Sequence, residues 1–125
     1  LRGACAARAE WIVETTAQLA AIESPSEDAT GLARCRQALA VLLADLGADL
    51  APGGEAGPHL LATRGRGTRQ VLLLGHFDTV WPLGTLAAMP VTVRDGRVHG
   101  PGTFDMKAGL VLALLAGAVA GPLLQ

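Results

Sequence analysis

Aromatic residues are scarce in this chain of 125 residues, because they make up 3% of it and tyrosine is absent. Its core must therefore be built mainly from Leu, Val and Ala, which suits helices packed tightly on a sheet. With 50% hydrophobic and 17% charged residues, the composition is globular and not disordered. The length fits one ordinary domain, and we find no repeat, low-complexity tract or linker that would divide it.

Clusters of like charge are also missing. The formal net charge is -1, and the basic residues are isolated, as at Arg64, Arg66 and Arg69. This pattern has no electrostatic footprint for nucleic acid or an anionic membrane, so neither is expected as a partner. The longest apolar run, 109–124, is interrupted by glycine and shorter than the ~18 to 20 residues that a membrane span needs. We expect a buried helix there.

Cysteine is sparse, with only Cys5 and Cys35 in the sequence, and both lie in segments with a helical pattern. Two cysteines in an otherwise ordinary chain favour free buried thiols over a disulfide framework, which points to a reducing cytoplasm. The chain begins at Leu1 without a basic and then apolar leader. We therefore expect no targeting signal, and we expect both ends to be cuts in a longer protein.

Helical periodicity is clearest in the first third of the chain. Residues 4–22 combine strong helix formers with an apolar stripe, and a breaker-rich segment follows. A second stripe of period near 3.6 covers 32–46, with Thr30 or Asp28 as its N-cap and Gly47 at the C-cap. Two helices are therefore predicted.

Extended segments are predicted at 48–50 and 59–63, and Asp95-Gly96 predicts the turn of a hairpin spanning 91–98. Gln70 to Leu74 is apolar without alternation, which is typical of a central strand buried on both faces of a parallel sheet. We expect this strand to be the centre of the fold.

The strand ends in "GHFDTV", which places His76 and Asp78 directly after the apolar run. Ligands of open α/β sheets bind outside the carboxyl ends of the strands. In extended geometry His76 and Asp78 point to the same side, so the carboxylate can hold the ring and leave its other nitrogen for a metal. A histidine that caps a strand end without a ligand remains the alternative at this point.

A second segment, "GPGTFDMKAG", leads into an apolar helix predicted from about Met106 to Ala120. Asp105 stands at the threshold of this helix, where the backbone N–H groups favour negative charge, so taken alone it would be an N-cap. The glycines could also cradle a phosphate, but both the Walker spacing and the GxGxxG pattern are missing.

In combination, "GHFDTV" and "GPGTFDMKAG", 29 residues apart between His76 and Asp105, together with "IESPSED" after the first helix, resemble a known family. They look like the N-terminal part of the catalytic domain of the dizinc exopeptidases and amidohydrolases, peptidase family M20. The following "WPLGTL" is most similar to the glutamate carboxypeptidase branch. The resemblance runs from about Ala9 to Ala120, and it implies an α/β, three-layer domain with a mainly parallel central sheet, present only in part.

The resemblance assigns roles to single residues. It implies that His76 is a terminal ligand of one zinc, that Asp105 bridges two zincs, and that Asp78 is the catalytic acidic residue that orients the histidine. Zn²⁺ suits such a donor set, and Co²⁺ or Mn²⁺ could replace it. Asp105 should then lie within about 3 to 5 Å of the His76 ring. Lys107 matches a common lysine, although a solvated or carboxylate-paired role is expected for it.

His59 and His99 match no ligand position and are expected to be structural. After Asp105 the sequence contains no Asp, Glu, His or Cys, so the Glu-Glu pair and the later ligands implied by the resemblance are absent, as is the dimerisation domain. Residues 1–125 are therefore predicted to be an inactive N-terminal portion of a zinc hydrolase, whose homodimeric parent cleaves an amide bond in a peptide or N-acyl amino acid. A non-catalytic binding or assembly module with the same fold is the alternative.

Overall fold

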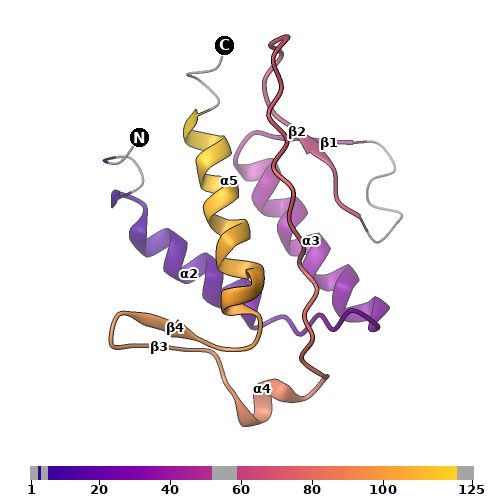
Figure 1. Ribbon diagram of the computed structural model, residues 1–125, viewed down its shortest axis with the longest axis vertical. Coiled ribbons are helices and arrows are strands. Elements are labelled where there is room, and N and C mark those ends of the chain that lie inside the picture. Colours follow the sequence, from indigo (N-terminus) through magenta and orange to yellow (C-terminus); the bar gives the residue numbers. More distant parts are fainter. Residues whose placement is uncertain (1–2, 4–5, 52–58, 121–125) are drawn as a thin grey trace.

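The computed structural model describes residues 3, 6–51 and 59–120. Three longer helices, α2 (Ala9–Ala20), α3 (Ala29–Asp45) and α5 (Ala108–Ala120), correspond to the two predicted from periodicity and to the predicted apolar helix, and two small sheets lie beside them (Figure 1). The buried core contains one or two side chains from each helix: Leu19, Cys35, Leu39 and Val111. The three helices therefore share a single apolar core, built without tyrosine.

The start of α3 resolves the two predicted N-caps. The Asp28 carboxylate accepts a hydrogen bond from the Gly31 N–H at 2.7 Å, so Asp28 is the N-cap and Thr30 lies inside the helix. At the other end, Gly47 has a φ of +77° and donates its N–H to the Ala44 carbonyl at 2.9 Å. Gly47 thus provides the left-handed residue that commonly ends a helix.

Both sheets are antiparallel pairs. Strands β1 (Asp49–Leu50) and β2 (Ala62–Thr63) pair with each other, within the segments predicted at 48–50 and 59–63. Strands β3 (Thr92–Arg94) and β4 (Arg97–His99) form the predicted hairpin, in which Asp95 and Gly96 both have positive φ. Positive φ at both turn positions matches the twist of the flanking strands, which explains why the Asp-Gly pair was informative.

The prediction of a central strand at Gln70 to Leu74 is wrong for the part of the chain that the structure describes. Among those residues, this segment pairs with no other strand. It runs as an extended trace beside α5, where Leu73 faces Gly117 and Gly75 faces Leu110 (Figure 1). Val71, Leu72, Leu73 and Leu74 are 73%, 77%, 56% and 86% exposed. A strand needs neighbours for its ladder of hydrogen bonds, and apolar character alone does not supply them. The mixed α/β character holds, but the parallel sheet is not present in this part.

The last helix is preceded by the wide turn η1 (Thr103–Lys107), in which Asp105 and Met106 have non-helical dihedrals. α5 therefore begins two residues later than predicted, at Ala108. The stretch Thr103–Ala120 is long and apolar enough to cross a membrane, with a mean hydropathy of 1.6, but its regular helix is only the 13 residues of α5. Val111 and Leu115 are buried whereas Leu112 is 52% exposed, so only one face of the helix meets the core.

Candidate metal centre

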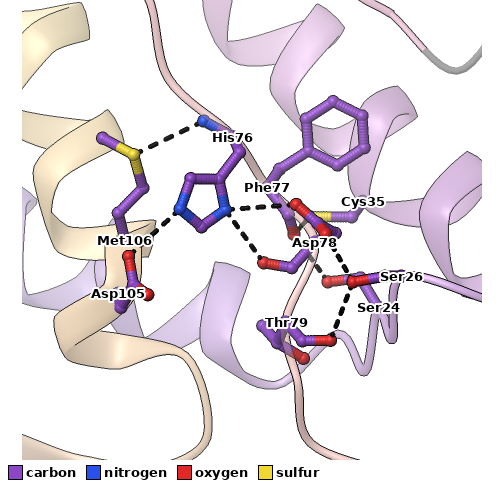
Figure 2. A network of polar contacts seen from close by, with 9 residues as sticks. All are labelled: Ser24, Ser26, Cys35, His76, Phe77, Asp78, Thr79, Asp105 and Met106. Carbon is purple, nitrogen blue, oxygen red and sulfur yellow. Dashed lines mark hydrogen bonds and ion pairs between the residues drawn. The ribbon is translucent and has the colours of Figure 1, made fainter.

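His76 lies where the extended segment leaves α5, and its backbone N–H points to the Met106 sulfur at 3.4 Å (Figure 2). Its side chain is 46% exposed and turns toward two carboxylates, not into the core. The ring is therefore accessible to a ligand from solvent.

Asp78 holds one side of this ring. Its Oδ1 lies 3.1 Å from His76 Nδ1, and its carbonyl oxygen lies 3.3 Å from the same nitrogen. Two acceptors at Nδ1 favour the tautomer that carries its proton there. With its proton on Nδ1, the ring would offer the Nε2 lone pair to a bound metal ion.

Asp105 lies on the other side of the ring, with its Oδ1 3.1 Å from His76 Nε2. This distance agrees with the separation of about 3 to 5 Å expected from the sequence. The carboxylate faces the imidazole and its side chain is 79% exposed, and its hydrogen bond goes to His76 and not to an N–H of α5. The alternative in which Asp105 is a helix N-cap is therefore wrong.

The loop that carries Asp105 fits closely against Thr79, which follows the extended segment. Gly102 has a φ of +70°, and a Cβ there would lie 2.5 Å from the Thr79 methyl carbon, so only glycine allows this approach. The Lys107 N–H donates to the Gly102 carbonyl at 3.0 Å and closes the turn. Gly102 thus explains how "GPGTFD" folds back over His76.

The segment "IESPSED" binds the backbone that follows His76, a role that the sequence did not reveal. The Thr79 N–H donates to the Ser24 carbonyl at 2.8 Å, the Ser26 N–H donates to the Thr79 carbonyl at 3.1 Å, and Pro25 and Thr79 form a parallel bridge. The Ser24 hydroxyl donates to the Phe77 carbonyl at 2.7 Å. The only signal for these contacts was that the segment accompanied the two site motifs.

Lys107 differs from its expected solvated or carboxylate-paired role. It is 1% exposed, and its Nζ donates to the carbonyl oxygens of Leu19 at 3.0 Å and Ile22 at 2.6 Å. Leu19 lies in the last turn of α2 and Ile22 two residues beyond its end, and the Leu19 carbonyl also accepts the Ile22 N–H at 3.1 Å. Burial lowers the pKa of Lys107, although Cys35 and Glu23 act against this effect. Lys107 therefore ties the Asp105 turn to the end of α2.

The two groups nearest the imidazole also shift its titration. Partial burial lowers the pKa of His76, but the contacts with Asp105 and Asp78 outweigh it, so the net pKa is above the ordinary 6.5. A hydrogen bond from Ser26, and then the nearby His76, hold the pKa of Asp78 below its ordinary value. Asp78 is therefore a carboxylate at neutral pH.

The donors present fit part of a zinc site. An imidazole nitrogen and a carboxylate oxygen 3.1 Å apart are close to the roughly 3.3 Å that separates two ligands of one tetrahedral zinc. Across residues 3, 6–51 and 59–120, no group of three or more His, Cys, Asp or Glu side chains is arranged to hold a metal ion. His99 lies in β4 opposite Thr92, and His59 is exposed, and neither joins the network of Figure 2.

Comparison with known proteins shows which family shares these motifs. Residues 72–120 match the model of the family described as Peptidase family M20/M25/M40. The chain is 32% identical over 108 residues to carboxypeptidase G2 of Pseudomonas sp. (strain RS-16), covering 82% of this chain and 26% of that protein. It is 34% identical over 111 residues to succinyl-diaminopimelate desuccinylase of Stenotrophomonas maltophilia (strain R551-3), covering 84% and 28%.

A shorter match, 48% identical over 52 residues, is to acetylornithine deacetylase of Photorhabdus laumondii subsp. laumondii, covering 39% of this chain and 14% of that protein. The chain thus spans roughly a quarter of the length of the first two relatives, 26% and 28%. Both site motifs, GHFDTV and GPGTFDMKAG, lie inside the family match. Over this partial length, the chain belongs to peptidase family M20/M25/M40.

Proposed function

We propose that this chain is part of a zinc-dependent hydrolase that cleaves an amide bond in a peptide or an N-acyl amino acid. The observation that carries the proposal is the position of His76 between two carboxylates, with Asp78 at Nδ1 and Asp105 at Nε2, each 3.1 Å away. The relatives are named as a carboxypeptidase, a desuccinylase and a deacetylase, which supports hydrolysis of an amide-type bond.

Each residue of this arrangement has a defined task. Nε2 of His76 and the exposed Asp105 carboxylate, which lie 3.1 Å apart, are the side-chain donors that would hold zinc. Asp78 accepts a hydrogen bond from the Nδ1–H group, which would fix the ring orientation and raise the basicity of Nε2. Bound zinc supplies Lewis acidity, which polarises a carbonyl group and makes water more acidic. Co²⁺ or Mn²⁺ suits the same donors.

The remaining donors and the general base come, in this proposal, from polypeptide outside residues 1–125, because the sequence after Asp105 holds no Asp, Glu, His or Cys. The same additional chain would supply strands to the exposed apolar segment Val71–Leu74 and make it the central strand of a mainly parallel sheet. We also propose a reducing cytoplasm as the location, which suits the free, buried Cys35 thiol. A homodimeric parent is part of the same proposal.

Zinc titration of the 125-residue chain by calorimetry tests the proposal. We expect weak binding that is reduced at least about tenfold by His76→Ala and by Asp105→Asn, because each removes a direct donor. His59→Ala is the matched control, since His59 is exposed and outside the network. Zinc binding that survives His76→Ala, or is lost equally in His59→Ala, would contradict the proposal and favour a non-catalytic binding or assembly module.

A further inference from the structure

Ser26 is in direct contact with the carboxylate that holds His76. Its hydroxyl donates to Asp78 Oδ2 at 2.5 Å, while Asp78 Oδ1 faces His76 Nδ1 at 3.1 Å (Figure 2). The two carboxylate oxygens therefore have separate partners, one from a loop 52 residues earlier in the chain and one from the imidazole. With both oxygens engaged, the plane of the carboxylate is held relative to the ring.

The Ser26 backbone is held by main-chain hydrogen bonds, and beside its bond to Asp78 the hydroxyl adds only a long contact of 3.5 Å to the Thr79 carbonyl (Figure 2). Its N–H donates to the Thr79 carbonyl at 3.1 Å, the Thr79 N–H donates to the Ser24 carbonyl at 2.8 Å, and Pro25 and Thr79 pair as a bridge. These bonds set the distance between the Ser26 side chain and Asp78. Removal of the hydroxyl should therefore leave the loop in place and release only the carboxylate.

A free Asp78 carboxylate would not keep this orientation. The terminal torsion of an aspartate is broad and roughly two-fold, so the carboxylate turns easily unless hydrogen bonds hold it. The Asp78 side chain is 38% exposed, so water can compete for Oδ2 once the Ser26 hydroxyl is gone. The preference for the proton on Nδ1 of His76 would weaken as the acceptor turns away.

We propose that Ser26 is a positioning residue of the metal centre, which holds Asp78 so that His76 carries its proton on Nδ1 and presents Nε2 beside Asp105. The inference rests on the proposed function only where it concerns the affinity for zinc. The effect of Ser26 on the tautomer of His76 can be measured without a metal.

The chain supplies a matched control, because its only other serine, Ser24, lies two residues away. The Ser24 hydroxyl donates to the Phe77 carbonyl and the residue is fully buried. Ser24→Ala therefore removes a hydroxyl of the same kind that touches the backbone and not the Asp78 carboxylate. Ser26→Thr keeps a hydroxyl donor at the test position and should rescue the effect of Ser26→Ala.

The first measurement is the pair of ring ¹⁵N chemical shifts of His76 in the ¹⁵N-labelled 125-residue chain, at one alkaline pH where imidazoles are neutral. The His76 signals are assigned by their loss in His76→Ala. Because Asp78 and Asp105 compete for the proton of the neutral ring, the measured quantity is the share of Nδ1–H tautomer. We expect the same share in the unchanged chain, in Ser26→Thr and in Ser24→Ala, and a smaller share in Ser26→Ala, with the proton shifted toward Nε2 and Asp105.

The second measurement is the affinity for Zn²⁺ alone. We expect Ser26→Ala to weaken this affinity about threefold to tenfold. Loss of a residue that binds a metal-coordinating side chain directly typically costs roughly 10- to 100-fold, and Ser26 acts one contact further away, through Asp78. Ser26→Thr should restore it. Failure of the unchanged chain to bind Zn²⁺ through His76 would count against the proposed function, whereas the tautomer measurement would still decide the role of Ser26.

An unchanged His76 tautomer in a folded Ser26→Ala chain would overturn the inference. So would equal changes in Ser26→Ala and Ser24→Ala, which would indicate a general loosening of the loop. Loss of the fold in Ser26→Ala, monitored by circular dichroism, would show that the hydroxyl supports the structure and not the ring orientation, and would overturn it as well.

Discussion

The Lys107 Nζ lies 2.6 Å from the carbonyl oxygen of Ile22, although the two residues are 85 positions apart in the sequence. Lys107 is the single lysine of the chain and is 1% exposed. Because Asp105 lies two residues before it, this buried hydrogen bond connects the candidate metal ligand to the end of α2. The buried Lys107 side chain thus helps to hold the candidate site against the helical core.

Replacement of Lys107 by methionine should destabilise the chain by about 1–3 kcal/mol, because the carbonyl oxygens of Leu19 and Ile22 would lose their buried donor. Urea unfolding of the variant and the unchanged chain measures the difference. A folded Lys107→Met chain of equal stability would show that water or another group satisfies these carbonyls.

The same burial should protect Lys107 from acylation. We expect an amine-reactive ester to modify Lys107 slowly under native conditions and quickly in urea. Mass spectrometry of digested samples measures this site, and because the chain has no other lysine, the assignment is direct. Rapid native modification of Lys107 would be incompatible with its buried position.

Acid should loosen the short helix α4 (Thr85–Ala88) through Glu23. The Glu23 carboxylate accepts from the N–H groups of Gly84 at 3.0 Å and Leu86 at 2.9 Å, which lowers its pKa from the ordinary 4.5. A depressed folded pKa means that Glu23 stabilises the fold above about pH 4.5 and that this contribution is lost as the pH falls through the folded value.

Hydrogen exchange at Gly84 and Leu86 should therefore accelerate, after correction for intrinsic rates, when the pH falls below 4.5. In Glu23→Gln the acceleration should be absent, because the side chain no longer titrates. Glu27→Gln is a suitable control, since Glu27 is exposed and lies in the same loop. An acid response that persists in Glu23→Gln would assign it to another group.

The N-cap of α3 can be tested by paired substitutions. Asp28→Ala should cost about 1 kcal/mol of stability, because it removes the acceptor for the Gly31 N–H. Thr30→Ala, the other candidate from the sequence, should change stability little, since Thr30 lies within the helix. Urea unfolding distinguishes the two, and a larger loss for Thr30→Ala would reverse the assignment.

The exposed segment Val71–Leu74 should make the isolated chain self-associate. Unpaired extended backbone with apolar side chains is a template for pairing with another copy. We expect the mass measured by light scattering to rise with concentration, and to rise less in Leu72→Lys and Leu74→Lys. Val80→Lys, at a residue 92% exposed outside the segment, is the control. Concentration-independent mass in the unchanged chain would contradict this prediction.

Hydrolysis of an N-acyl amino acid by the purified 125-residue chain with added Zn²⁺ should be undetectable. A zinc ion in a stable protein site has about four ligands, and this chain offers two candidate donors, His76 and Asp105. Release of the free amino acid measures the reaction. Chelator-sensitive activity that disappears in His76→Ala would show that these residues suffice for catalysis.

Patterns between near neighbours in the sequence determined much of this protein. The 3.6-residue period predicted α2 and α3, and Asp95-Gly96 predicted a hairpin. The two-residue spacing of His76 and Asp78 predicted that both side chains lie on one side of an extended segment. Each depends on residues a few positions apart, whose relative geometry the backbone dictates. The approach of Asp105 to His76 came from the family resemblance, and the structure shows it at 3.1 Å.

Only the tertiary structure decided the contacts between distant segments. The burial of Lys107 depends on carbonyl groups at the end of α2, and the role of Ser26 depends on Asp78, which is 52 residues away. For Gln70 to Leu74 the apolar pattern was misleading, because a strand requires partner strands and the described residues provide none for it. A sequence specifies which groups seek burial or partners, but only the folded chain determines which partners lie within reach.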